Sequence, residues 1–71
     1  MNRVVVVEDE TMARKGIILT IDWSALGCVI VGEAANGEEG AALVERLSPD
    51  IVVTDVIMAI SAFMRLRKTA C

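Results

Sequence analysis

Histidine is absent from this chain of 71 residues, and cysteine occurs only twice, at Cys28 and Cys71. Two thiolates without a histidine do not make the four-ligand site that structural zinc requires. A small secreted domain held together by disulfides also contains more cysteines than this chain does. We therefore expect both cysteines to be ordinary free thiols.

Aromatic residues, basic charge and glycine-rich phosphate loops are also scarce. Trp23 and Phe63 are the only aromatic residues, and the formal net charge is −3, which disfavours direct contact with nucleic acid. Three cations near the C-terminus fit the end of a helix, with a small nucleic-acid patch as the alternative. Neither the Gly-x-Gly-x-x-Gly turn of dinucleotide sites nor the Walker loop of nucleotide triphosphatases occurs, so those classes are excluded.

No apolar run is long enough for a membrane span. The longest extends over nine residues, from Val56 to Met64, and Ser61 interrupts it, whereas a spanning helix needs about 20. The first residues also lack the apolar core and cleavage site of a signal peptide. We therefore expect a cytoplasmic protein that makes no membrane contact.

Apolar residues, by contrast, make up 55% of the chain. A chain of this length buries only about 60% of its unfolded surface, so this composition is high for a domain that stands alone. We expect one small domain that either belongs to a larger unit or hides apolar surface in a homo-oligomer, most simply a dimer.

Short strand-like runs alternate with helical patterns along the chain. The predicted strands occupy residues 4–7, 28–31 and 51–54, and Gly32 is expected to close the second. Helical spacing covers residues 10–21, then 36–47 between the N-cap pair Asn36 and Glu39 and the helix-breaking Pro49, and it resumes from Val56. This alternation predicts an α/β fold: half of a three-layer, doubly wound parallel sheet of the flavodoxin-like type, with strand order 2-1-3.

Acidic residues directly follow two of these strands. Glu8 and Asp9 come after the first, and Asp55 comes after the third. In the order 2-1-3 the three carboxylates meet at the carboxyl edge of the sheet, with no basic residue expected beside them. Mg²⁺ would remove their mutual repulsion, and Asp55 would act either as its ligand or as a nucleophile. Taken singly, these acids fit loop entries or a helix start, but their combination favours a metal and phosphate site.

Three stretches resemble the receiver domain of bacterial two-component response regulators. They are VVVVEDE, VIVGEAANGEEG and PDIVVTDVIM, in the order and spacing of that family. The stretch IDWSALGCVIVGEA is similar in particular to the YesN-like receivers attached to AraC-type DNA-binding domains. The resemblance covers about residues 3–58. It implies a CheY-like fold and a transcriptional response regulator that is not itself an enzyme.

The resemblance also implies a role for each matching residue. Asp55 would accept a phosphoryl group from a histidine kinase. Glu8, Asp9 and Asp55 would hold Mg²⁺, with Asp9 the stronger candidate of the acidic pair for direct contact. The backbone carbonyl of Ile57 would supply a further ligand.

The chain departs from the family after Met58. Ala59 follows directly where the family has a loop of Pro, Gly and Asp residues, and the Ser or Thr and the Lys that follow the family's fourth and fifth strands have no counterpart. We therefore expect residues 1–71 to form a partial receiver. It would hold three strand–helix units with a shortened connection after the third strand, and lack units four and five and an output domain.

The alternative function is that of a truncated, self-associating fragment with a vestigial acidic site and no phosphotransfer. No residues are expected to form a fourth strand, so the third strand would have an open outer edge. That edge and the last predicted helix, with Ile60, Phe63 and Met64, would pair with a second copy.

Overall fold

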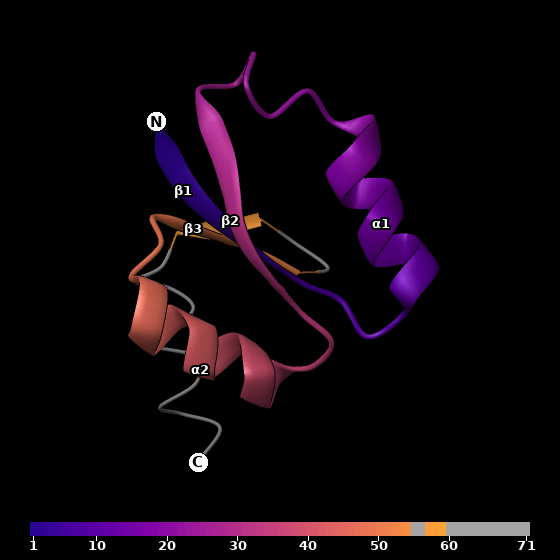
Figure 1. Ribbon diagram of the computed structural model, residues 1–71, viewed down its shortest axis with the longest axis vertical. Coiled ribbons are helices and arrows are strands. Elements are labelled where there is room, and N and C mark those ends of the chain that lie inside the picture. Colours follow the sequence, from indigo (N-terminus) through magenta and orange to yellow (C-terminus); the bar gives the residue numbers. More distant parts are fainter. Residues whose placement is uncertain (55–56, 60–71) are drawn as a thin grey trace.

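The computed structural model describes residues 1–54 and the backbone of residues 57–59 (Figure 1). Its elements are β1 (Asn2–Val7), α1 (Thr11–Thr20), β2 (Cys28–Ala34), α2 (Gly37–Leu47), β3 (Ile51–Val53) and β4 (Ile57–Ala59). They form one sheet of order β2-β1-β3-β4, in which β1 pairs in parallel with both β2 and β3. The predicted α/β class and the strand order 2-1-3 are therefore confirmed.

The central strand β1 supplies the core on both faces of the sheet. Its four valines are buried, and because successive residues of a strand point to opposite faces, they divide into two clusters. One cluster, on the α2 side, contains Val5, Val7, Ala34, Val44 and Val52. The other contains Val4, Val6, Cys28 and Val53, against which Ile17, Ile18 and Trp23 pack. The helices lie on opposite sides of the sheet (Figure 1), which confirms the three layers.

The cysteine prediction is confirmed for the part of the chain that the structure describes. Cys28 is a buried free thiol at the start of β2, and its Sγ donates weakly to the carbonyl of Leu26 at 3.6 Å. Cys71 lies outside the described residues.

The second strand is longer than predicted, because Gly32 does not close it. The register with β1 passes from Val4–Ile30 to Val5–Gly32, so Val31 is an extra residue in a β-bulge. A Cβ at Gly32 would lie 3.1 Å from Leu47 Cδ1 and 3.3 Å from Leu43 Cδ1. The glycine therefore makes room for α2 on the strand, and the prediction that it ends the strand is wrong.

Both ends of α2 agree with the prediction. The N–H of Glu39 donates to Asn36 Oδ1 at 2.8 Å, and Asn36 Nδ2 donates to Glu39 Oε2 at 2.9 Å, which caps the first turn. The helix stops at Ser48, a left-handed residue (φ 47°) directly before Pro49, and the N–H of Ser48 donates to the carbonyl of Val44. Of the helices described, neither α1 nor α2 has the length and apolar character to cross a membrane.

The strand β4 corrects the expectation of a helix from Val56 onward. Residues 57–59 run antiparallel to β3, with Val53 opposite Ile57 and Ile51 opposite Ala59. This pairing engages main-chain groups of β3 that an open edge would leave without partners. The expected open edge of the third strand is therefore wrong, and with it the argument that a second copy pairs there. The rest of the predicted helix, including Ile60, Phe63 and Met64, lies outside the described residues.

Candidate functional site at the carboxyl edge of the sheet

The acidic pair lies directly beyond the carboxyl end of the central strand. β1 ends at Val7, and the N–H of the next residue, Glu8, still donates to the carbonyl of Ala34 at 3.0 Å. Glu8 is half-buried and Asp9 is exposed. Hydrogen bonding to β2 therefore fixes the backbone of Glu8, and Asp9 follows it, exposed, at the carboxyl edge of the sheet.

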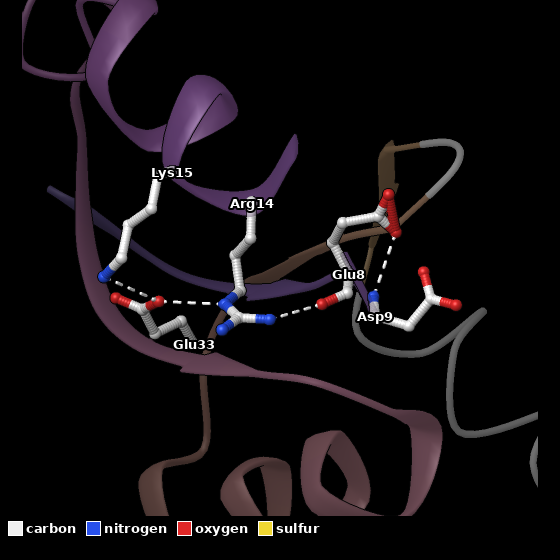
Figure 2. A network of polar contacts seen from close by, with 5 residues as sticks. All are labelled: Glu8, Asp9, Arg14, Lys15 and Glu33. Carbon is white, nitrogen blue, oxygen red and sulfur yellow. Dashed lines mark hydrogen bonds and ion pairs between the residues drawn. The ribbon is translucent and has the colours of Figure 1, made fainter. Parts of the chain in front are cut away.

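The local geometry leaves carboxylate oxygens available to a ligand. The N–H of Asp9 donates to Glu8 Oε2 at 3.1 Å, which ties the Glu8 side chain to the backbone of the next residue. The Asp9 carboxylate makes no hydrogen bond or ion pair with any residue that the structure describes, and in Figure 2 it points away from the neighbouring cations. Hard divalent cations prefer such oxygen donors, so Glu8 and Asp9 fit Mg²⁺.

A basic residue lies beside this pair, contrary to expectation. Arg14, on α1, donates from its terminal NH1 to the carbonyl of Glu8 at 2.6 Å and from Nε to Glu33 Oε1 at 2.9 Å. Figure 2 shows its guanidinium between the two acids, Glu33 on one side and Glu8 on the other. The expectation failed because Arg14 reaches Glu8 only when α1 folds back against the sheet.

Glu33 completes the network from the neighbouring strand. It lies near the end of β2 and also pairs with Lys15, whose Nζ is 3.4 Å from Glu33 Oε1. The hydrogen bond from Arg14, helped by Lys15, holds the pKa of the Glu33 carboxyl below its ordinary value of 4.5, and partial desolvation opposes this shift.

This lowered pKa predicts the direction of a pH effect on stability. Because the folded state holds Glu33 ionised more strongly than the unfolded state does, its contribution is fully present above about pH 4.5 and is lost as pH falls through the folded pKa. Urea unfolding from pH 7 to pH 3 should therefore show the native chain more stable than Glu33→Gln at neutral pH, with the gap closing in acid. A gap that stays constant across this range would contradict the prediction.

The structure tests the predicted site only in part. Glu8 and Asp9 lie together, as expected, but Asp55 lies outside the described residues and Ile57 is described only as backbone in β4. Within residues 1–54, no three cysteine or acidic side chains come together in a way that would hold a metal ion. Arg14 and Glu33 were missed because nothing in their sequence spacing indicates that a helix residue and a strand residue meet.

Comparisons with known proteins point in one direction. The sequence model described as "Response regulator receiver domain" matches residues 4–64. The chain is 38% identical over 58 residues to the transcriptional regulatory protein YdfI of Bacillus subtilis, covering 82% of this chain and 27% of that protein. It is 38% identical over 55 residues to the nitrate/nitrite response regulator protein NarL of Escherichia coli, covering 78% and 25%.

A third relative is also described as a transcriptional regulator. The uncharacterized transcriptional regulatory protein YesN of Bacillus subtilis is 34% identical over 58 residues, which cover 82% of this chain and 16% of that protein. The chain thus spans only about a sixth to a quarter of the length of these relatives. No solved structure matches it at a significant level.

Proposed function

Because the chain belongs to the family of response regulator receiver domains, we propose that Asp55 accepts a phosphoryl group from a histidine kinase. The observation that carries the proposal is the adjacent pair of carboxylates, Glu8 and Asp9, at the carboxyl end of the central strand. That edge is where open parallel sheets bind their ligands.

The pairing of β1 with β3 supports a place for Asp55 near this pair. Val6, two residues before Glu8, is the register partner of Val53, two residues before Asp55. The two strands are parallel, so they deliver the chain to the same edge of the sheet. We propose that Glu8, Asp9, Asp55 and the backbone carbonyl of Ile57 hold one Mg²⁺ ion.

Each residue then has a defined task. A carboxylate oxygen of Asp55 attacks the phosphorus in line, the phosphorus–nitrogen bond to the kinase histidine breaks, and an acyl phosphate forms on Asp55. Glu8 and Asp9 would hold the divalent cation, whose positive charge would reduce the repulsion between their two carboxylates. When bound, Mg²⁺ neutralises negative charge on the phosphoryl oxygens.

The relatives indicate the wider setting. Several carry names of transcriptional regulators, so we propose that the parent protein is a cytoplasmic transcriptional response regulator. This segment would receive the signal and make no direct contact with nucleic acid. The alternative of a self-associating fragment without phosphotransfer loses the argument from an open edge, because β4 pairs with β3. Its other grounds, the short chain and the high apolar content, are unchanged. Self-association itself stays an untested prediction.

The proposal predicts the outcome of one labelling experiment. Incubation with a phosphoramidate donor and Mg²⁺ should add one phosphoryl group to the native chain, as seen by intact-mass spectrometry. Asp55→Asn should abolish the gain, because an amide oxygen is a far weaker nucleophile than a carboxylate.

A matched control separates the acceptor from other carboxylates. Asp22 is an exposed acid in the connection between α1 and β2, where it accepts a hydrogen bond from the N–H of Ala25. Asp22→Asn should leave labelling unchanged. A mass gain that persists in Asp55→Asn would show that another residue is the acceptor, and no gain in the native chain would overturn the proposal.

A further inference from the structure

Arg14 occupies an unfavourable position for a cation. Its N–H donates to the carbonyl of Glu10, the N-cap residue of α1, at 2.9 Å, so it belongs to the beginning of that helix. A helix N-terminus carries partial positive charge and disfavours a basic side chain. The Arg14 side chain is nevertheless only 13% exposed. Specific contacts must therefore offset the cost of placing this charge there.

The contacts use the planar geometry of the guanidinium. Nε donates to the Glu33 carboxylate at 2.9 Å, while NH1 donates to the Glu8 carbonyl at 2.6 Å. Lys15 carries the same charge on the next residue but is 52% exposed, and its one polar partner among the described residues is Glu33, at 3.4 Å. Arg14 thus joins β2 to the residue that follows β1, and Lys15 does not (Figure 2).

The hydrogen bond from Arg14 is the third that holds the Glu8–Asp9 segment in place. The Glu8 N–H donates to Ala34, the Asp9 N–H donates to the Glu8 carboxylate, and the Glu8 carbonyl accepts from Arg14. The peptide that joins Glu8 to Asp9 is therefore held at both its carbonyl and its N–H. Removing the Arg14 bond would free the carbonyl and let the peptide rotate.

We propose that Arg14 is a positioning residue: its bridge between Glu33 and the Glu8 carbonyl holds the Asp9 carboxylate in the orientation that binds the divalent cation. This inference rests on the proposed function, since it assumes that Mg²⁺ binds at this pair. It assigns Arg14 no contact with the metal or with the phosphoryl group. Its contribution is pre-organisation of a ligand, as for groups that orient metal ligands in other proteins.

The direction in which Mg²⁺ affinity changes distinguishes a positioning role of Arg14 from a purely electrostatic effect of its charge. A nearby cation repels Mg²⁺, so charge alone predicts that Arg14→Ala binds Mg²⁺ more tightly. Positioning predicts the opposite, a loss of about tenfold in affinity. We expect the loss in a Mg²⁺ titration followed by the amide resonance of Asp9. In metal-free protein, the Asp9 amide of Arg14→Ala should also exchange with solvent faster than that of the native chain.

Lys15→Ala is the matched control, because it removes the same charge from the next residue without touching Glu8. It should leave Mg²⁺ affinity unchanged or raise it. Arg14→Lys keeps the charge, but an ammonium does not reproduce the rigid two-donor fork, so it should also bind Mg²⁺ more weakly than the native chain. If the amide spectrum of Arg14→Ala is not that of a folded protein, Arg14→Lys is used for the Mg²⁺ titration instead.

The outcomes distinguish this inference from the proposed function. If the native chain binds Mg²⁺ and Arg14→Ala binds it as well as Lys15→Ala does, only the positioning role is overturned. An Arg14→Lys variant with native affinity overturns it too. If the native chain shows no Mg²⁺-dependent change at Asp9, the proposed metal site and the role of Arg14 fall together.

Discussion

Replacement of Val52 by alanine is expected to lower the free energy of unfolding by about 2 kcal/mol. Val52 is fully buried in the middle of β3, opposite Val5 of the central strand, and it joins the cluster beneath α2. The substitution removes two buried carbon atoms and leaves a cavity that the surrounding β-sheet fills poorly. A chain this short has a small margin of stability, so the loss should be a large part of the total.

Val29→Ala is the matched control for this loss. Val29 lies on β2, so it has the same residue type and the same kind of backbone, but it is 41% exposed. Its truncation should change the free energy of unfolding by less than about 0.5 kcal/mol. Urea denaturation followed by Trp23 fluorescence measures both variants. Equal losses in the two would show that burial in β3 does not control stability.

Gly40→Ala should also destabilise the protein, against the usual preference of helices for alanine. A Cβ at Gly40 would lie 2.7 Å from Val7 Cγ2 and 3.4 Å from Val7 Cγ1. Val7 is buried and β-branched, so it has little freedom to move away. Overpacking of about 1–3 kcal/mol exceeds the gain of about 1 kcal/mol in helix propensity, and we expect a net loss of about 1 kcal/mol.

The same substitution on the other helix should have the opposite sign. Gly16 lies inside α1, and apart from its chain neighbours and the backbone of its own helix, no atom of the described residues lies within 4 Å of the position of its Cβ. Gly16→Ala should therefore stabilise the chain by about 0.5–1 kcal/mol. Thermal and urea unfolding of the two variants provide the comparison. Stabilisation by Gly40→Ala would contradict the close packing of α2 on β1.

Elements with strong local signals could be predicted from the sequence. The run of four valines at residues 4–7 fits only a buried strand, and the Asn36–Glu39 pair with Pro49 delimits α2 on both sides. The alternation of strands and helices predicted parallel pairing, and the order 2-1-3 came from the flavodoxin-like type of sheet expected for the chain. In the site, Glu8 and Asp9 were placed correctly because they directly follow the strongest strand.

The errors occurred where a residue's role depends on its partners in space. Ile57 to Ala59 are apolar residues that suit a helix or a strand, and the main-chain groups of β3 decide in favour of the strand. Gly32 looked like a strand end, but the leucines of α2 require it inside the strand. Arg14 and Glu33 meet only because α1 packs against the sheet, so no local sequence pattern predicts their ion pair.

The parallel pairing of β1 has a consequence for how the protein is made. β1 precedes both of its partner strands in the sequence, which begin at Cys28 and Ile51. Until those residues have been synthesised, the four valines of β1 lack the neighbouring strands between which they are buried. Such non-local pairing slows folding and exposes apolar strand to other chains in the meantime. Of the described strands, β1 is thus the one that stays longest without its partners during synthesis.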